Sequence, residues 1–574
     1  VNTHLVYTHG TGMALAAANQ VQANGNPVFG VADVPPVSQP GYPSITQSGI
    51  FFGPNQPGYV VANSKQLELD YQTTTGVNIQ NHYAGTGGVK INGILRRAAF
   101  ALRLGDFNLL ISNLVTNESR IMFVRDIGAM AQKAAPFLSF DANPYSVLVD
   151  GKVKWVMDGY TTTSQYPYSQ NAGTFALPLG SGLPSNYNYA RNSVKLVVDA
   201  YSGEMTYYVV DKSDPIIRAY QSAFPNLLVD GSTMPEALRA HLRYPEDLFG
   251  AQAAVYGRYH ITNASAFYNA GDAWALSLTA GAGPPSQTLA LTTQTNSQGV
   301  VIQGAAQRMA PQYQVQALPG TTAQTFVVSE AYVPASAGNK TQNLSAFMMG
   351  TSDPSNYGQI TVYVTPSGQS ITGPVMADAQ IQQNTKVSAV ITPLDQHGSS
   401  VLLGNILMVP INQSMLYVRP LYVTSSGNPL PQLKYVIAVY GTHVGIETSL
   451  EAALNSVLSA AVNLPSNNSG GNGQGTSSPN AAAATALLSQ AQAAYAEAQA
   501  ALKNGDLAAY QAAIQTMYQD LLAAQNLLGG ATTNTQTSPV TTTTAPATTT
   551  TKAKAGSTTT SSPLKAVPSA FFGS

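Results

Sequence analysis

The chain has 574 residues, of which 44% are hydrophobic and 9% are charged, and its 26 basic and 27 acidic side chains give a net charge of −1. The charged fraction is far below the about 25% of typical soluble proteins, so Gln, Asn, Ser, Thr and 30 Tyr residues must carry the surface polarity. This charge balance excludes the electrostatic footprint of a nucleic-acid-binding protein, and the absence of cysteine excludes thiol catalysis, thiolate metal sites and disulfides.

Such an uncharged surface keeps its character when carboxylates become protonated. The composition therefore predicts an acidic exterior as the working environment, and drift of composition in an envelope protein is the alternative explanation. A pH profile of stability separates the two, because acid denaturation acts through protonation of carboxylates that are charged in the native state.

The start of the chain, VNTHLVYTHGTG, invites a metal interpretation. His4 and His9 are five residues apart, so they lie on opposite faces of a strand and share no face of a helix, which argues against a common ion. The Pro-rich and Gly-rich segment 26–58 predicts an extended surface loop. Helical periodicity predicts one helix over 94–104 and a second over 118–135, which a proline ends.

Two later segments predict β-hairpins. In YSVLVDGKVKWVMDGYTTT, residues 145–163, the pair Asp150-Gly151 is the strongest short-range hairpin signal in the chain. In RNSVKLVVDAYSGEMTYYVVDKSDP, residues 191–215, apolar residues alternate on both arms around a Ser-Gly turn. The strands end in the similar triplets DGY and DAY, which fits an internal duplication or, as we favour, two similar hairpins.

Ionisable residues gather where these strands end, in a chain otherwise poor in charge, and this predicts a binding site without naming a reaction. The candidate binding residues are Arg191, Asp199, Tyr201, Asp211, Asp214, His241, Arg243, Asp158 and His9. Because so few charges are available, we expect Arg191 and Asp199 to be paired and partly buried. No catalytic residue, metal ligand or cofactor is predicted.

The segment HLRYPEDLFGAQAAVYGRYH, residues 241–260, predicts a helix that a proline opens, with Glu246 and Asp247 as routine capping acids. One face carries residues at helical spacing: Leu248, Gln252, Val255 and Tyr259. If the helix is continuous, His241 and His260 stand roughly 20 Å or more apart at its two ends. They are then too far apart for a shared zinc ion.

Templates for named reactions are absent: there is no G-x-S-x-G elbow, Walker sequence, H-E-x-x-H or calcium loop. Two generic chemistries stay open. The Asp-Lys-Ser-Asp run at 211–214 offers oxygen ligands for calcium, and Asp158 with Asp199 offers an acid and base pair of the glycosidase kind. The simpler interpretation of these strand-end acids is that they cap turns.

The predicted fold class is α+β. The predicted parts are a mixed α/β lobe with β-hairpins over 1–280, a variable insertion over 281–310, a mostly β lobe over 311–464, a linker over 465–479, a helical hairpin over 480–530 and a disordered Thr-rich tail over 531–574. The β lobe is predicted from alternating segments such as QITVYV, KVSAVI and QLKYVIAVY. The tail lacks apolar periodicity and cannot offset the entropy of ordering.

Several long blocks in the right order carry a resemblance to a known family. They include ESRIMFVRDI, WVMDGYTTTSQYPYS, RNSVKLVVDAYSGEMTYYVVDKSDPII and HLRYPEDLFGAQAAVYGRYH. Together they resemble the large extracytoplasmic portion of uncharacterised protein family UPF0182, a family of bacterial integral membrane proteins, over most of residues 1–450. The resemblance implies transmembrane helices before this portion, and it implies no activity, because none is established for the family.

Two classes of function follow. The leading hypothesis is a non-catalytic domain on the extracellular side of the cell membrane, attached through a preceding segment, that binds or organises cell-envelope components or membrane-protein partners. The alternative is a hydrolase or transferase that acts on envelope glycans or lipids through the strand-end carboxylates. A deep pocket bringing these carboxylates near His241 or His9 would favour the enzyme. Carboxylates each paired with Arg or backbone N–H groups would favour the binding role.

Overall fold

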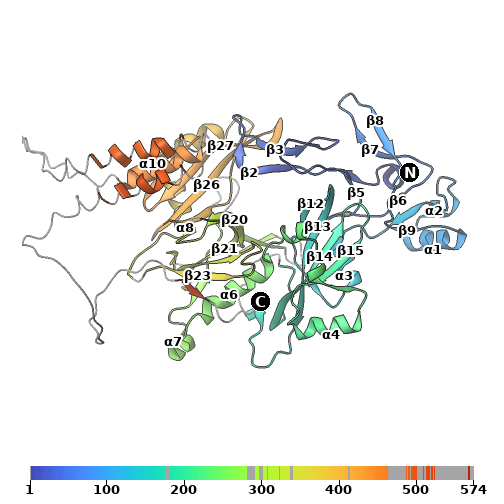
Figure 1. Ribbon diagram of the computed structural model, residues 1–574, viewed down its shortest axis with the longest axis horizontal. Coiled ribbons are helices and arrows are strands. Elements are labelled where there is room, and N and C mark those ends of the chain that lie inside the picture. The colour runs from blue at the N-terminus through green and yellow to red at the C-terminus, as the bar shows by residue number, and fades with distance from the viewer. Residues whose placement is uncertain are drawn as a thin grey trace, which may run out of the picture. The chain divides into compact units, whose positions relative to one another are not determined.

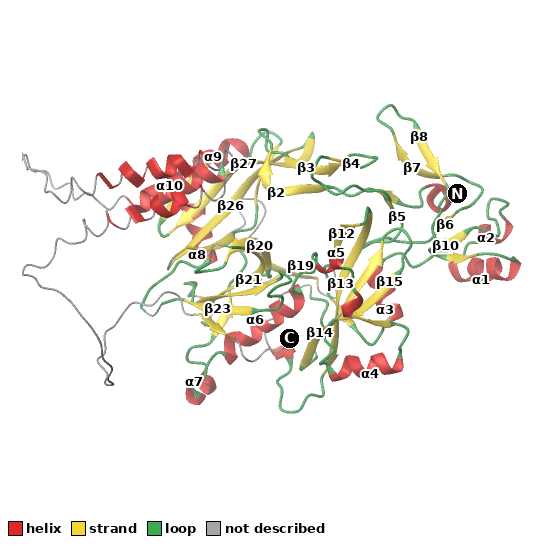
Figure 2. Cartoon of the chain, viewed as in Figure 1, coloured by secondary structure: helices red, strands yellow, loops and turns green. Residues whose placement is uncertain are grey.

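Figures 1 and 2 show the computed structural model of the chain, which describes residues 2–462 with internal gaps, helical positions between 486 and 523, and the strand Ala566–Pro568. The internal gaps are 175–180, 185, 281–290, 296–300, 307, 322, 337–340, 367 and 412–413. The chain divides into two compact units, of which one comprises Val1–Leu464 with Ser561–Ser574 and the other comprises Pro465–Thr560.

The two predicted hairpins form one sheet in the first unit. Its strands are β11 (Ser139–Phe140), β12 (Tyr145–Val149), β13 (Lys152–Thr163), β14 (Tyr189–Asp199), β15 (Met205–Val209) and β16 (Leu228–Asp230). The hairpins β12–β13 and β14–β15 are joined because β13 also pairs antiparallel with β14. In the first turn, Asp150 and Gly151 have φ values of 52° and 72°, as a type I′ turn requires.

The two faces of this sheet pack against different helices, because successive side chains of a strand alternate. On one face, Met157 of β13 and Leu196 of β14 share a buried core with α3 (Ile127–Ala134) and α4 (Pro215–Ala223). On the opposite face, the next residues along each strand, Val156 and Val197, pack with Leu238 of α5 (Glu236–Arg239). Both faces are therefore covered, and charged side chains on either face must be buried.

Short antiparallel sheets precede this one in sequence. They pair β1 (Gly10–Thr11) with β5 (Gly49–Ile50), β2 (Leu15–Val21) with β3 (Pro27–Ala32) and β4 (Val37–Ser38), β6 (Val60–Ala62) with β10 (Arg120–Met122) and β9 (Val89–Lys90), and β7 (Glu68–Gln72) with β8 (Asn78–Asn81). The prediction of an extended loop over 26–58 was therefore wrong in part, since β3, β4 and β5 lie within it. The Pro and Gly residues of this segment mark the turns between short strands.

The β2–β3 ribbon connects distant parts of the first unit, and Figure 1 shows it extending toward β27 (Asn428–Tyr440). The Leu433 N–H donates to the Gly25 carbonyl oxygen at 2.9 Å. The Lys434 ammonium donates to the Asn24 carbonyl oxygen at 2.9 Å. Residues 410 positions apart in the chain are thus joined at the tip of this ribbon.

Of the two predicted early helices, one is confirmed and the other is wrong in its first half. The helix α1 spans Ile94–Leu104, as predicted, and the short helix α2 (Asn108–Ile111) follows it. The helix predicted over 118–135 is instead β10 followed by α3. The Asp126 side chain caps α3 by accepting the Ala129 N–H at 2.8 Å, so the helix cannot extend back past this residue. Periodicity alone does not separate a short apolar strand from a helix turn.

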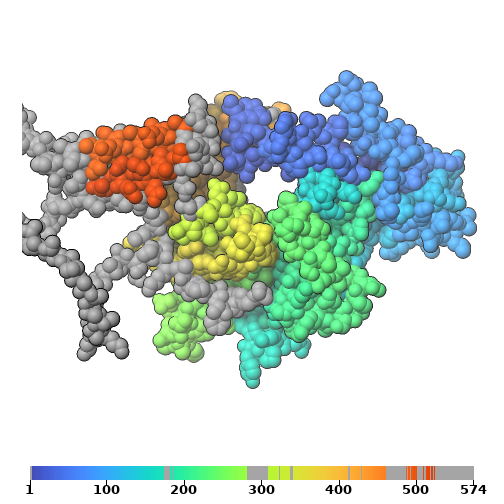
Figure 3. Space-filling view, in the orientation of Figure 1, coloured from blue at the N-terminus to red at the C-terminus, as the bar shows by residue number. Residues whose placement is uncertain are grey.

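A second six-stranded sheet supports the predicted helix at 241–260. Its strands are β17 (Trp274–Leu276), β20 (Gln312–Ala317), β21 (Gln324–Pro334), β22 (Ala346–Thr351), β23 (Ile360–Val364) and β29 (Ala566–Pro568). The helix α6 (Glu246–Tyr259) packs on it, with Phe249 in the same buried core as Val328 and Tyr332. In the space-filling view, yellow atoms of this sheet lie against green atoms of the preceding part of the chain (Figure 3). The short helix α7 (Ala264–Asn269) follows α6.

A third sheet and three helices complete the first unit. The strands are β24 (Ser399–Leu403), β25 (Leu407–Ile411), β26 (Ser414–Ser425), β27 and β28 (His443–Glu447), and the helices are α8 (Pro374–Gln383), α9 (Thr385–Leu394) and α10 (Leu450–Val462). The segment KVSAVI, predicted as a strand, lies in α9, which Asn384 caps by accepting the Lys386 and Val387 N–H groups. At this site the cap outweighs the β preference of the branched residues.

One buried ion pair links α8 to the third sheet. Arg419 of β26 donates to the Asp378 carboxylate of α8 and to the Gly404 carbonyl oxygen. Both side chains are almost completely buried. Removing either partner would leave an uncompensated buried charge.

The remaining predicted parts lie mostly outside the described residues. Within the predicted insertion over 281–310, β18 (Leu291–Thr295) pairs with β19 (Val301–Ala306). The linker at 465–479 is not among the described residues, and the described positions of 480–530 are helical. Of the predicted disordered tail, Ala566–Pro568 is described and differs from the prediction, because it pairs with the edge of β23.

The predicted α+β class is confirmed, since helices and several mostly antiparallel sheets share the first unit. Among the described residues, no helix has both the length and the apolar character that a membrane span requires.

Replacing Gly151 by Val tests the turn on which the central sheet depends. We expect a loss of about 2 kcal/mol or more in the free energy of unfolding, because a β-branched residue resists φ of 72° and a Cβ here would overlap the Thr46 side chain. Urea denaturation measures the change. Gly76→Val is the control, since Gly76 also has positive φ but open space around the added Cβ, and it should lose less. A loss at Gly151 below about 0.5 kcal/mol would contradict the assignment.

Candidate functional site

The predicted carboxylates of the central sheet form cross-strand ion pairs. Asp158 of β13 lies directly opposite Lys195 of β14, and Lys154 lies opposite Asp199. Asp158 accepts from the Lys195 ammonium, which also donates to the Tyr357 hydroxyl at 2.7 Å, and both members of the pair are buried. Complete burial raises the pKa of Asp158, and the adjacent Lys195 ammonium opposes that rise.

Asp199 is half-buried and its oxygen atoms are engaged. It lies 3.2 Å from the Lys154 ammonium and accepts the backbone N–H groups of Tyr201 and Ser202 at 3.0 and 2.9 Å. Burial alone would raise the pKa of this carboxyl, but the hydrogen bonds from the turn and the Lys154 charge outweigh burial and lower it. Asp199 therefore holds the turn of the β14–β15 hairpin and is charged at neutral pH.

Arg191, at the other end of β14, pairs with a different acid. Its Nε lies 2.7 Å from Asp211, which also accepts the Ser213 N–H and hydroxyl. The expectation that Arg191 and Asp199 are each paired and partly buried is confirmed, but their partners are Asp211 and Lys154. The two residues lie eight positions apart along β14, so they belong to different surroundings.

Asp214 caps α4 and is fully hydrogen-bonded. It accepts the Thr161, Ser193 and Tyr189 hydroxyl groups at 2.5, 2.6 and 2.8 Å, and the first N–H groups of the helix. These bonds occupy the oxygen atoms that a calcium ion would need. In the described part of the chain, no group of three or more His, Asp or Glu residues is arranged to hold a metal ion.

His9 and Tyr201 meet at one aromatic cluster. The His9 ring stacks on Phe51 at 4.4 Å, and Tyr201 packs edge-on against the same ring at 5.4 Å. His9 Nε2 is 3.4 Å from Asp70, and its Nδ1 is 3.9 Å from buried Glu68. Burial lowers the pKa of His9, and the two acids oppose this effect only in part. The ring is therefore neutral at pH 7 and packs as part of the aromatic cluster.

His241 and Arg243 lie in different surroundings. His241 is exposed, whereas Arg243 lies between two aromatic rings, 4.3 Å from the Tyr145 centroid and 4.6 Å from the Tyr313 centroid. Its guanidinium donates to the Asn143 carbonyl oxygen at 2.7 Å. Since Lys195 donates both to Asp158 and to the Arg243 carbonyl oxygen, the structure brings the predicted residues Arg243 and Asp158 to one buried region.

That region contains acids whose role the sequence did not indicate. Asp141 accepts the Tyr160 hydroxyl at 2.8 Å and the Asp247 N–H at 3.3 Å. Asp247 accepts the Gly182 N–H at 2.7 Å and the Ala142 N–H at 3.2 Å. Burial, and then repulsion from Asp141, raises the pKa of Asp247 to about 6. Asp247 stands in the first turn of α6, as predicted, and also ties this helix to the central sheet.

Glu330 of β21 is completely buried, and neither of its carboxylate oxygens has a hydrogen-bond partner in the described part of the chain. Burial, together with the Glu246 charge, raises its pKa well above the ordinary range. A proton on Glu330 removes the cost of an unpaired buried charge. A signal existed in the sequence, because Glu330 is the one acid in the apolar run TFVVSEAYVP.

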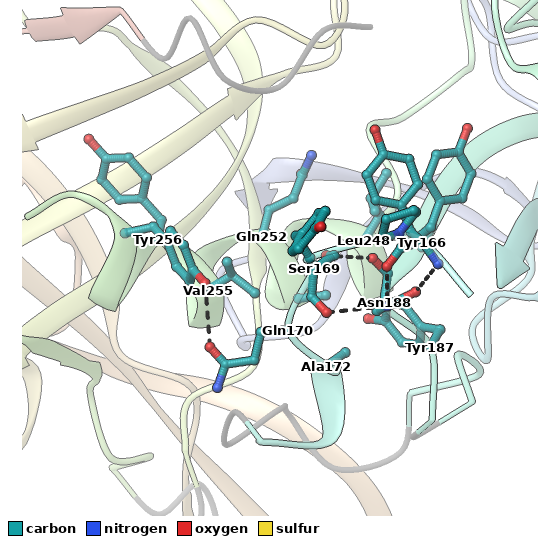
Figure 4. A pocket seen from close by; sticks show the side chains of 16 residues that line it. Tyr166, Ser169, Gln170, Ala172, Tyr187, Asn188, Leu248, Gln252, Val255 and Tyr256 are labelled. Carbon is teal, nitrogen blue, oxygen red and sulfur yellow. Dashed lines mark hydrogen bonds between the residues drawn. The ribbon is translucent and has the colours of Figure 1, made fainter. Parts of the chain in front are cut away.

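Beside this region lies a groove of about 760 Å³ between α6 and the segments 166–172 and 187–190. Figure 4 shows side chains from both sides of it. Six of the lining residues are tyrosines, namely Tyr166, Tyr168, Tyr187, Tyr189, Tyr256 and Tyr259. The predicted helix face lines it too, through Leu248, Gln252 and Val255. None of the described residues that line the groove carries a formal charge.

Comparison with known proteins decides the family. The model of the family described as "Uncharacterised protein family (UPF0182)" matches residues 1–394. The chain belongs to this family. A UPF0182 protein from Cupriavidus necator is 37% identical over 519 residues, which cover 90% of this chain and 52% of that protein. A UPF0182 protein from Methanospirillum hungatei is 37% identical over 522 residues, which cover 89% of this chain and 53% of that protein.

The UPF0182 chain thus spans about half the length of the curated relatives it matches. No solved structure matches it. Membership of the family that the sequence blocks resemble is confirmed, and the family description names no activity. Chemistry in this UPF0182 chain must therefore be argued from the buried acids and the groove.

Replacing Asp199 by Asn tests whether this acid is structural. We expect the free energy of unfolding at pH 7 to fall by about 2 kcal/mol, because two backbone N–H groups and Lys154 lose a charged acceptor. The pKa of Asp199 is lowered in the folded state, so its stabilisation is present at neutral pH and is lost as the pH falls through the folded value. Urea denaturation at pH 7 and at acid pH measures both effects.

Glu118→Gln is the control for this change, since Glu118 pairs with Lys90 on the surface and exposed pairs contribute little. A stable Asp199→Asn protein that has lost binding to an envelope extract would make Asp199 part of the functional site.

Glu330→Gln tests the buried acid. Because the pKa of Glu330 is raised on folding from its ordinary 4.5, its carboxyl favours folding below the unfolded value and opposes it as the pH rises. Gln has no charge to bury, so the stability of the variant relative to the natural chain should rise as the pH is raised from 4 to 7. Glu447→Gln, at an exposed position, should leave the difference between the two pH values unchanged. Equal curves for Glu330→Gln and the natural chain at pH 7 would show that Glu330 has a partner.

Proposed function

We propose that this chain is an extracytoplasmic domain of a membrane protein and that it binds or organises cell-envelope components. The single observation that carries the proposal is the pairing of the strand-end carboxylates. Asp158, Asp199 and Asp211 each have a Lys or Arg partner, and Asp214 caps a helix. Acids held in this way support a rigid sheet and are not themselves free to act as an acid and base pair.

Two further observations support a binding role. The groove beside α6 is lined by tyrosines and has a volume within the about 300–1,000 Å³ of ligand pockets. Family membership supports the location, because the matched relatives are about twice as long as this chain and leave room for a membrane part. Attachment to the membrane and the extracellular side are parts of the proposal.

The alternative, a hydrolase or transferase on envelope glycans or lipids, is favoured by one observation. Asp247, whose burial raises its pKa to about 6, precedes the groove residue Leu248 in α6. A carboxyl with such a pKa can act as a general acid or base near neutral pH. Its two bonds to backbone N–H groups favour a structural role instead.

The test is sedimentation of the purified chain with an isolated envelope fraction, followed by long incubation. We expect the chain to sediment with the envelope fraction and to release no soluble sugar or fatty acid. Release that is lost in Asp247→Asn would establish the enzyme. Failure to sediment, with no release, would contradict both functions.

The location is tested separately in the full-length protein. The chain has no cysteine, so Thr74→Cys, at an exposed position next to β8, introduces a single thiol in this portion. We expect a membrane-impermeant maleimide to label this thiol in intact cells. Labelling should exceed that of the parent protein, which lacks the thiol. Labelling only after lysis would place the domain on the cytoplasmic side.

A further inference from the structure

The geometry of the groove between α6 and the segments 166–172 and 187–190 points to a neutral glycan as its ligand, and we propose that this groove is the site through which the domain binds uncharged envelope polysaccharide. The inference rests on the proposed function and names its ligand class. Four features of the groove carry it: its charge, its rings, an unpaired hydroxyl group and its amide groups.

The absence of charge selects against charged ligands. None of the described lining residues is Asp, Glu, Lys or Arg. An acidic polymer or a phosphate group would find no cation to offset its desolvation. The ion pairs of this part of the molecule, Arg191 with Asp211 and Lys195 with Asp158, lie among residues that do not line the groove. An uncharged ligand is therefore favoured.

The tyrosine rings favour a ligand with alternating apolar and polar surface. A ring face is electron-rich and packs against polarised C–H groups, while the hydroxyl group provides a hydrogen bond at the ring edge. Pyranose rings present such C–H faces and hydroxyl edges. An acyl chain would cover the ring faces but would leave the tyrosine hydroxyl and amide groups desolvated without partners, which costs free energy for each group.

Tyr187 adds a polar group without a partner among the described residues, beside the groove. Its side chain is 6% exposed, and its hydroxyl group has no hydrogen-bond partner in the described part of the chain. A buried hydroxyl without a partner is costly. Tyr187 lines the groove, but its hydroxyl oxygen is itself shielded from solvent, so a sugar hydroxyl would pair with it only once the side chains that cover it shift.

The loop that carries Tyr166 and Tyr168 is held in place before any ligand binds. The Asn188 side chain accepts the Tyr166 N–H at 3.0 Å and donates to the Tyr166 and Ser169 carbonyl oxygens at 2.9 and 3.2 Å. Figure 4 draws hydrogen bonds of Asn188 beside Tyr166 and Ser169. The Tyr166 ring stacks on Tyr189 at 5.6 Å. Preorganisation of this kind lowers the entropic cost of binding.

Tyr168 stands at the exposed end of this loop with φ of 58°. A left-handed backbone is strained for a bulky residue, and such strain gathers at ligand-binding positions. Its side chain is fully exposed, so no packing in the described chain explains a large aromatic residue here. A ligand that covers the Tyr168 ring would explain why a large aromatic residue stands here.

The amides of the groove provide further polar contacts. The Gln252 carbonyl oxygen accepts the Tyr244 hydroxyl at 2.8 Å, which orients the side chain and leaves its NH₂ group as a donor. Gln170 accepts from the Tyr259 hydroxyl at 3.4 Å. Amide groups hydrogen-bond sugar hydroxyls without introducing charge.

The experiment is affinity electrophoresis of the purified chain in gels that contain a soluble polysaccharide. The probes are laminarin, dextran and xylan as neutral polymers and polygalacturonate as an acidic one. Vesicles of a neutral phospholipid are tested by flotation. We expect retardation by at least one neutral polymer, none by polygalacturonate, and no flotation.

Three variants separate the groove from the rest of the surface. Tyr168→Ala should weaken binding about ten-fold through loss of an exposed ring. Tyr187→Phe should weaken it about three- to ten-fold by removing one hydrogen bond and should leave stability unchanged or improved, since the hydroxyl has no partner in the described chain. Tyr268→Ala is the matched control, because Tyr268 is an exposed tyrosine of α7 outside the groove, and it should bind as the natural chain does.

Each other outcome overturns the inference: no retardation by any neutral polymer, equal retardation of the groove variants, retardation by polygalacturonate alone, or flotation with vesicles in place of glycan binding. Envelope sedimentation of the Tyr168→Ala, Tyr187→Phe double variant distinguishes this failure from failure of the proposed function. If the double variant sediments as the natural chain does, the groove is not the site although the domain still binds the envelope. If the natural chain binds glycan but does not sediment, the proposed function fails and the groove stands.

Discussion

The pairing of β13 with β14 is the constraint on which the first unit depends. It joins two local hairpins into one sheet and places Lys195 opposite Asp158 in the interior. A buried charge is tolerated only with a partner, so any slip of register would separate this pair and move each apolar residue to the wrong face. Lys195 also donates to the Arg243 carbonyl oxygen and to the Tyr357 hydroxyl, which lies between β22 and β23. These bonds tie the segment before α6 to the central sheet.

Tyrosine takes over the tasks that charged residues perform in most proteins. Tyr160 binds the buried Asp141, Tyr189 binds Asp214, and Tyr145 with Tyr313 encloses Arg243. A phenol adds apolar area and one hydrogen bond while remaining neutral across the physiological pH range. Several acids in this interior, above all Glu330 and Asp247, have pKa values raised by burial, which favours the folded state at mildly acidic pH. The same residue type then lines the one groove described here as a ligand site.

The sequence predictions succeeded where the deciding forces were local. The Asp150-Gly151 turn, the helix over 94–104 and the helix that Pro245 opens depend on neighbouring residues, and each is present. They failed at 118–135 and at KVSAVI, where a cap residue and neighbouring strands decided between helix and strand. Arg191 and Asp199 are paired, as expected. The nine candidate site residues do not form one cluster, because partners such as Lys154 and Asp70 come from other strands.

By itself, the sequence determined the α+β class, the two hairpins, the family and the electrically neutral character of the surface, since each follows from composition, turn chemistry or long matching blocks. Only the tertiary structure decided which acids are paired, that Glu330 is buried without a partner among the described residues, and that the tyrosines of 166–168 and 187–189 face α6 across a groove. The physical reason is that a partner or a cavity wall is a property of two segments brought together. For the groove, those segments are about 80 residues apart in the chain, beyond the reach of any local pattern.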